Sequence, residues 1–262
     1  MNIKNFIFSI MSLVILLSSC KNDGDGINDT PEPYTVPETP VEWVLDFEDN
    51  FEGTSLDENV WGIYDNAWSD DPAHMRRREA VQVKDGLLTL LVATHPVDPE
   101  RYMTGGIAHN KNYMYGKFEF RVRIDQDPAN ATSGVCLTWP ESEEWPKDGE
   151  MDIYETEYDG NFFNTWIHYG VKGSDGVYYD NKYQQTHRVD KSQWHIIALE
   201  WSPEYAKIYI DGELHWNLKD PEAIASSPHH VCFQTEKGSD AALAGPVKMQ
   251  VDWVKVYNRV EI

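Results

Sequence analysis

The stretch Gly149-Glu150-Met151-Asp152-Ile153-Tyr154-Glu155-Thr156-Glu157 places four carboxylates within eight residues of a segment that otherwise has the pattern of a β-strand. Acidic residues are disfavoured inside strands, and like charges on one face repel each other. A sequence that keeps them there either exposes an acidic strand face to water or uses the acids for chemistry.

The spacing of the acids helps to separate these alternatives. Side chains alternate along a strand, so Glu150 and Asp152 share one face, whereas Glu155 falls on the opposite face of a regular strand. A β-bulge near Ile153-Tyr154 would bring Glu155 to the face of the other two acids. The two glutamate carboxyl groups would then lie about 5–6 Å apart, because each side chain leans inward from backbones roughly 13 Å apart. That distance favours a retaining glycosidase, at ~5–5.5 Å, over an inverting one, at ~6.5–9.5 Å.

Around this stretch the chain resembles glycoside hydrolase family 16. The family motif Glu-x-Asp-x-(x)-Glu matches residues 150–155 in its longer, bulged form, and Trp145-Pro146-Lys147-Asp148-Gly149 is similar to its lead-in. An ordered set of matches is far more specific than one acidic motif, and this set covers about residues 43–262. The further matches are residues 47–57, 83–87 and 115–119, Trp139-Pro140, His168-Tyr169-Gly170, residues 194–201, Asp211-Gly212 and residues 251–257.

The resemblance assigns roles to the acids. It implies that Glu150 is the nucleophile, that Glu155 is the acid/base, and that Asp152 hydrogen-bonds the nucleophile. Three acids on one face are coupled, so at least one pKa must rise. Glu157 would share the same face one step further out, and we expect it to take no part in the reaction.

Four other residues are candidates for substrate binding. Trp139 and Trp145 match tryptophans that stack on sugars in the family, although core packing is the alternative for each. His168 lies on the next strand and either hydrogen-bonds near the acids or has a structural role. Arg77 follows a loop at residues 67–74, where it either holds sugar hydroxyls or balances an acidic surface.

We expect no cofactor in catalysis. The sequence has no His-Glu-x-x-His or Cys-x-x-Cys spacing for a metal. Members of the family often carry a structural calcium ion on the convex side. The resemblance implies the carboxylate of Asp252 and the carbonyl of Gly86 as its ligands, and such oxygen ligands suit calcium.

Strand patterns with frequent turn signals fill residues 43–262 and predict an all-β sandwich or jelly roll. Apolar residues alternate at Phe118, Phe120, Val122 and Ile124, and again at Val247, Met249, Val251 and Trp253. Residues 195–201 and 206–210 predict further strands, Asp211-Gly212 a hairpin turn, and residues 221–226 one short helix. The family resemblance implies a curved β-jelly roll of the concanavalin A-like lectin/glucanase type, with the substrate cleft across its concave face.

The N-terminal region resembles the export signal of a bacterial lipoprotein. Residues 1–19 carry Lys4, a short apolar run and small residues, which together predict a signal peptide rather than a membrane span. Leu17-Ser18-Ser19-Cys20 resembles a lipobox, which implies lipidation of Cys20 and anchoring in the outer membrane of a Gram-negative bacterium. An ordinary signal peptide is the alternative. Residues 20–42 are acidic and rich in proline, as in an extended tether.

Composition narrows the class of substrate. The net charge of −22 argues against nucleic acid and anionic membrane surfaces as partners and disfavours sulfated polysaccharides. Aromatic residues make up 13% of the chain, which suits a site that binds the flat faces of sugars. We expect a monomer whose only membrane contact is the lipid anchor. Cys136 and Cys232 lie in apolar contexts, and either a disulfide or two free thiols fits them.

These observations predict a retaining, endo-acting β-glycoside hydrolase, most consistent with β-1,3- or β-1,3-1,4-glucan. An endo-β-galactanase acting on agar, porphyran, carrageenan or host glycans is the main alternative, and the basic run Arg76-Arg77-Arg78 would favour it. A carbohydrate-binding jelly roll without catalysis and a transglycosylase are further alternatives. We expect loops at residues 67–74, 126–132 and 175–185 to select the polysaccharide, because fold and acids alone do not.

Overall fold

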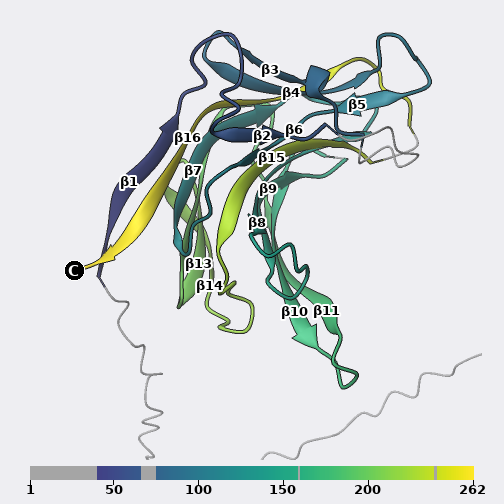
Figure 1. Cartoon of the computed structure of the whole chain (residues 1–262). Helices are drawn as coiled ribbons and strands as arrows, with labels where there is room; N and C mark the ends of the chain where they lie inside the picture. The colour runs from purple at the N-terminus through teal and green to yellow at the C-terminus, as the bar shows by residue number, and fades with distance from the viewer. Residues whose placement is uncertain (1–39, 66–74, 159, 239–240) are drawn as a thin grey trace, which may run out of the picture. The chain divides into compact units, whose positions relative to one another are not determined.

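The computed structural model describes residues 40–65, 75–158, 160–238 and 241–262, which form two antiparallel β-sheets (Figure 1). One sheet has nine strands in the order β14-β13-β12-β7-β16-β4-β3, with β1 paired to β16 and β5 paired to β4. Its strands are β1 (Val41–Asp49), β3 (Val81–Lys84), β4 (Leu87–Thr94), β5 (Tyr102–Thr104), β7 (Gly116–Ile124), β12 (His195–Ser202), β13 (Tyr205–Ile210), β14 (Glu213–Leu218) and β16 (Val247–Glu261).

The other sheet has seven strands in the order β11-β10-β9-β8-β15-β6-β2. A short 3-10 helix, η2 (Arg78–Ala80), precedes β3. The strands of this sheet are β2 (Trp61–Ile63), β6 (Gly106–His109), β8 (Thr132–Pro140), β9 (Glu150–Thr156), β10 (Phe163–Lys172), β11 (Tyr178–His187) and β15 (His229–Lys237). The predicted all-β jelly-roll architecture is confirmed for the described part of the chain.

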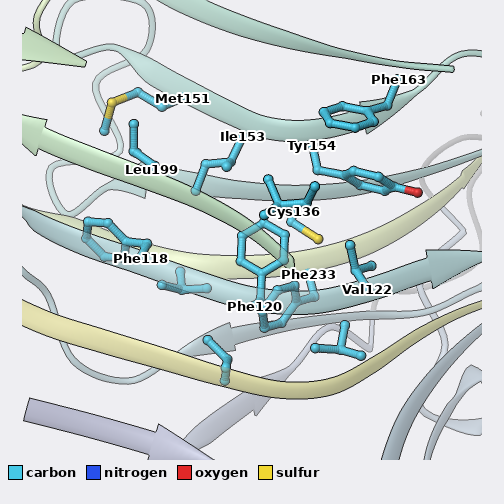
Figure 2. Packing of buried hydrophobic residues seen from close by; sticks show 14 of the residues in the cluster. Phe118, Phe120, Val122, Cys136, Met151, Ile153, Tyr154, Phe163, Leu199 and Phe233 are labelled. Carbon is cyan, nitrogen blue, oxygen red and sulfur yellow. The ribbon is translucent and has the colours of Figure 1, made fainter. Parts of the chain in front are cut away.

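The core lies between the two sheets. In β7 the apolar residues of the predicted alternation are buried, and the polar residues between them lie on the other face. Phe120 of this strand packs edge-on against Phe233 of the seven-stranded sheet, with ring centroids 5.7 Å apart, and Ile153 and Phe163 of that sheet belong to the same buried cluster (Figure 2). Each such side chain contributes about 1.5–3 kcal/mol when fully buried, so strand alternation is strongly selected on both inner faces.

Strand β9 carries the bulge that the acid spacing predicts. Across the strand pair, Asn164 lies opposite Glu155 and Trp166 lies opposite Asp152, so β9 advances by three residues where β10 advances by two. The pairing with β8 shifts at the same point. Ile153 and Tyr154 are both buried in the core, which is how Glu155 comes to the face of the earlier acids.

Two turn predictions have different outcomes. Asp211 and Gly212 connect β13 to β14 with φ angles of 51° and 85°, as the predicted hairpin turn requires. The short helix predicted at residues 221–226 is wrong. Those residues form a turn, in which the backbone N–H groups of Ala223 and Ile224 both donate to the carbonyl of Asp220.

The alternation predicted for the last strand holds only as far as Val251. The pairing between β16 and β7 shifts between Val251 and Trp253, so Trp253 leaves the core face. Val254 and Val256 are buried in its place. A bulge changes the parity of every later side chain, and the sequence pattern alone did not reveal this one.

The two described cysteines are free. Cys136 faces the core between the sheets, whereas Cys232 belongs to a small apolar cluster with Val135 and Leu137 on the opposite face of the sheet. The pairing of Cys232 with Leu137 and of Phe233 with Cys136 explains this, since neighbouring residues on a strand point to opposite faces.

Several predictions fall outside the described residues or at their edge. The signal segment, Cys20 and all but the end of the tether lie in residues 1–39, and the loop at residues 67–74 is also outside the described part. The prediction of a loop at residues 175–185 is wrong for most of its length, because residues 178–185 belong to strand β11. No helix of the described ranges is long and apolar enough to cross a membrane.

Candidate active site

The three acids of the predicted motif lie together on the face of the seven-stranded sheet that is turned away from the core, here called the site face. Glu150 and Asp152 precede the bulge in β9, and Glu155 follows it. Asp152 is only 5% exposed. Glu157 follows the end of β9 and accepts a hydrogen bond from the side chain of Asn164, so its carboxylate has a local structural partner.

His168 lies on β10 directly opposite Glu150. Its Nε2 is 3.5 Å from Oδ2 of Asp152, and its Nδ1 is 2.9 Å from Oδ1 of Asp180. The structure therefore places His168 beside the acids, as expected from its position on the next strand. The contact with Asp180 fixes the ring, and the other nitrogen faces the acid cluster.

Burial raises the pKa of all three acids. Removal from water is the largest cause for each, and for Glu155 the charges of Glu236, Glu157 and Glu150 add to it, so that its pKa rises to about 7. The pKa of Glu150 also rises to about 7, although hydrogen bonds with Trp145 and Asp152 oppose the rise. The pKa of Asp152 rises well above its ordinary value because it is fully enclosed and lies beside two carboxylates.

The cluster can therefore hold protons at neutral pH. Asp152 is the most deeply buried of the three, so a shared proton is most stable there and can be donated to Glu150. That leaves Glu150 as the acid best able to carry a negative charge. Glu155, raised mainly by burial and by other carboxylates, can keep a proton of its own near pH 7. Acid/base chemistry requires one carboxyl group to be ionised while the other holds a proton, and a coupled cluster that titrates near pH 7 can supply both forms.

The two predicted tryptophans lie next to the acids in different ways. Trp145 is 44% exposed, and its ring centroid is 6.2 Å from that of His168. Trp139 is half-buried on β8, and its Nε1 donates a 2.8 Å hydrogen bond to Glu143. Neither residue belongs to the core between the sheets. Trp139 packs against the small apolar cluster of Val135, Leu137 and Cys232 on the site face, so packing and sugar binding both stay open for it.

Arg77 lies among acidic side chains. Its guanidinium is 3.6 Å from Asp65 and 3.5 Å from Glu79. The neighbouring Arg78 contacts Glu58 at 2.7 Å. These contacts match the alternative in which the basic run balances an acidic surface, and they bring neither arginine to the acid cluster.

A cavity of about 650 Å³ opens on the site face next to the acids. Leu137 in its floor is the direct strand neighbour of Asp152, and Cys232 is the next residue across. The phenol of Tyr64 donates to the sulfur of Cys232 at 3.2 Å. The cavity is lined by Tyr64, Arg76, Ala108, Leu137, Trp139, Glu143, His230, Cys232 and Gln234.

Of the cavity residues, Trp139 is the one that the sequence predicts to bind substrate. The signal for some others was present, because His230, Cys232 and Gln234 alternate with the buried Val231 and Phe233 along one strand. The sequence did not indicate that this strand lies beside β8.

The predicted calcium ligands do not fit the ion well. Asp252 forms an ion pair with the guanidinium of Arg121, which already neutralises the one carboxylate that would hold the cation. Calcium usually takes six to eight oxygen ligands. The calcium site stays a prediction. Among the described residues, one group of three potential metal-binding side chains has its ligand atoms within 4.8 Å of one another, and this group, Glu150, Asp152 and His168, belongs to the acid cluster itself.

Comparison with known proteins places this geometry in a family. Residues 69–255 match the family model of glycosyl hydrolases family 16. A glucan endo-1,3-beta-glucosidase of Cryptopygus antarcticus is 28% identical over 199 residues, which cover 66% of this chain and 68% of that protein.

Solved structures share the fold. A laminarinase from Rhodothermus marinus superposes with a TM-score of 0.68 at 20% identity, over 84% of this chain and 99% of that one. LamA from Zobellia galactanivorans, solved with laminaritriose and laminaritetraose, gives 0.68 at 19% identity, over 82% and 99%. Because the family model spans most of the described sheets and the whole acid motif, this chain belongs to glycosyl hydrolases family 16.

Proposed function

We propose that this protein is an endo-acting β-glucan hydrolase with a preference for β-1,3 linkages, and that it works by a retaining double displacement. The observation that carries the proposal is the bulge in β9, which sets Glu150, Asp152 and Glu155 on one face beside a cavity. The names of the relatives, a glucan endo-1,3-beta-glucosidase and a laminarinase, support the choice of linkage.

In the first step Glu150 attacks the anomeric carbon, and the bond from that carbon to the leaving oxygen breaks. The proton of Glu155 passes to the leaving oxygen at the same time. Asp152 donates to Glu150 before the attack, which holds the nucleophile in place. The product of this step is a glycosyl ester on Glu150 and a shortened polysaccharide with a free hydroxyl.

In the second step water attacks the anomeric carbon while Glu155, now ionised, accepts a proton from it. The ester bond to Glu150 breaks, and both glutamates return to their starting states. Two inversions at one carbon retain the β configuration. No cofactor is needed for either step.

The surroundings of the acids supply the sugar contacts in this proposal. Trp145 offers an exposed ring beside His168, and Trp139 forms part of the wall of the cavity. The arginines do not strengthen the case for an anionic galactan, because Arg77 and Arg78 are paired with acids and Arg76 contacts Glu236. A neutral glucan remains the better match to a chain of net charge −22.

The test is product profiling of the full mature chain on laminarin, mixed-linkage glucan, agarose, porphyran, carrageenan and mucin glycans. We expect mid-length oligosaccharides from laminarin early in the reaction, with β configuration at the new reducing end by NMR. Glu150→Gln should lower turnover at least ~100-fold. Glu213→Gln, which removes one exposed carboxylate from β14, is the matched control. More than a few per cent residual turnover in Glu150→Gln, after removal of contaminating wild type, contradicts the assignment.

We also propose that the protein is exported and anchored by a lipid on Cys20, with the catalytic domain held away from the outer membrane by the tether. The lipobox-like sequence and the acidic, proline-rich residues that follow support this. Metabolic labelling with a fatty acid should mark the wild type and not Cys20→Ala. Labelling of both proteins, or of neither, contradicts lipidation at this residue.

A further inference from the structure

A fourth carboxylate faces the acid cluster from a different strand. Glu236 lies on β15, on the same face as the cavity residues Cys232 and Gln234, because it follows them at two-residue steps. Only strand β8 separates β15 from β9, so the two backbones lie roughly 10 Å apart. Long side chains on both strands can lean toward each other across that distance.

The side chain between them is small. Ser133 of β8 lies opposite Glu236, and its hydroxyl donates to the carbonyl of Thr156 on β9. Val135, the next residue on this face, lies opposite Glu155. The intervening strand therefore contributes only two short side chains, Ser133 and Val135, between Glu236 and Glu155.

Arg76 holds Glu236 in place. Its Nη2 is 3.1 Å from Oε1 of Glu236, and its Nη1 donates to Oγ1 of Thr104 at 3.0 Å and to the carbonyl of Thr235 at 2.6 Å. The side chains of Arg76 and Glu236 are 5% and 18% exposed, so this pair is fixed by the fold rather than mobile on the surface. Gln234 donates to the same Oε1 at 3.3 Å.

The charges around Glu155 come from four strands and the end of β9. Carboxylates outnumber cations in this group, and Lys182 is the cation that lowers the pKa of Glu155. The groups are Glu150, Asp152, Glu157 and Tyr158 on or after β9, His168 on β10, Asp180 and Lys182 on β11, and Glu236 on β15 with its partner Arg76.

We propose that Glu236, fixed by Arg76, is a positioning residue that acts through Glu155, and that its negative charge keeps the acid proton on Glu155 until the leaving oxygen takes it. This inference rests on the proposed function, in which Glu155 is the acid/base. Glu236 makes no bond to the substrate in this account. It sets the pH range over which Glu155 can serve as an acid.

The experiment follows the titration of Glu155 directly, by carbon NMR of protein labelled at the glutamate carboxyl carbons, with Glu155→Gln used for assignment. Glu236→Gln removes one negative charge, so we expect the titration midpoint of Glu155 to fall by about 0.5–1 pH unit. Glu236→Asp keeps the charge and should restore most of the midpoint. Glu213→Gln makes the same change in net charge on the other sheet and should leave the midpoint unchanged.

Kinetics on the substrate found by product profiling provide the second measurement. The basic limb of kcat/KM should move to lower pH by the same amount in Glu236→Gln, with KM little changed. If Glu236→Gln does not fold, Arg76→Gln provides the second variant, because it removes the cation that faces Glu236 and should raise the titration midpoint of Glu155 instead of lowering it.

In Glu236→Gln, a titration midpoint of Glu155 that stays within about 0.2 pH unit of wild type, or that rises, overturns the role of Glu236. If wild type releases no oligosaccharide from any polysaccharide, the proposed function is overturned instead. The NMR titration still decides in that case whether Glu236 controls the proton on Glu155. A changed KM with an unmoved midpoint identifies Glu236 as a substrate contact and also overturns the proposal.

Discussion

The outer faces of the two sheets differ in how their charged side chains are arranged: on one face opposite charges are paired, and on the other carboxylates cluster together. On the nine-stranded sheet, Arg121 pairs with Asp252, Arg123 contacts Gln250 at 2.6 Å, and both guanidinium groups lie over the ring of Trp194. On the site face, Glu150, Asp152 and Glu155 share one stretch of β9, and their charges raise one another's pKa values. A face with compensated charges is built for stability and solubility, whereas a buried cluster of like charges is maintained at a cost and marks a site of chemistry.

The largest effect that we expect is the loss of activity when Glu155 is replaced. Glu155→Gln should lower kcat/KM on polysaccharide by about 100- to 10,000-fold, because no group then protonates the leaving oxygen. On an aryl glycoside with a good leaving group, the first step needs no proton, so glycosyl-enzyme formation should be nearly normal. A stopped-flow burst of the released phenol, followed by slow turnover, would show this.

The matched control comes from the compensated face. Glu119→Gln on β7 removes a carboxylate that contacts Lys117 at 3.2 Å, and it should leave activity on both substrates within about twofold of wild type. Equal losses on polysaccharide and aryl glycoside in Glu155→Gln would contradict its assignment as the acid.

The pH dependence of kcat/KM is the next largest effect. Activity requires Glu150 ionised and Glu155 protonated, and both carboxyl groups have pKa values raised to about 7. Below this range Glu150 gains a proton, and above it Glu155 loses one, so activity should fall about tenfold per pH unit on each side of a narrow optimum near neutrality. Because the acids are coupled, the two limbs belong to the cluster rather than to single residues.

Initial rates between about pH 5 and pH 9 at constant ionic strength provide the measurement. Glu155→Gln assayed on the aryl glycoside serves as the control and should lose the basic limb while keeping the acidic one. A flat profile across this range, or an optimum at strongly acidic pH, would mean that burial does not raise the pKa of these acids.

The sequence predicts correctly those features that a short local pattern determines, namely the bulge in β9 and the core face of β7. Four acids in a strand conflict with strand propensity, and the spacing of Glu150, Asp152 and Glu155 makes sense only with an extra residue between them. The bulge at Ile153 and Tyr154 is present as predicted. The alternation in β7 likewise located the core face, because burial of every second side chain is a strong and local constraint.

What the sequence could not give is the order of strands that are far apart in the chain. Tyr64 and Glu236 reach the site face because β2 and β15 lie in the same sheet as β8 and β9, whereas Arg76 arrives from a bridge to Thr104 in the other sheet. Nothing in the local pattern of these segments specifies those neighbours. The predicted face of Trp253 is wrong for a different reason. A bulge in β16 has no acidic motif to reveal it, so simple alternation placed that ring on the wrong face.

The smallest effect concerns Asp252 on the compensated face. Asp252 and Arg121 are 30% and 36% exposed, and such pairs stabilise a fold by about 0–1 kcal/mol. Asp252→Asn should therefore lower the free energy of unfolding by less than ~1 kcal/mol and leave activity unchanged, since Arg121 keeps its contact with Trp194.

Thermal unfolding of wild type and variant, each with calcium and with EDTA, tests this together with the predicted calcium site. Because Arg121 already neutralises the carboxylate, we expect calcium to leave the Tm of both proteins unchanged. A rise of several degrees in wild type that is lost in Asp252→Asn would show that the cation displaces Arg121, and that this face also carries a binding site.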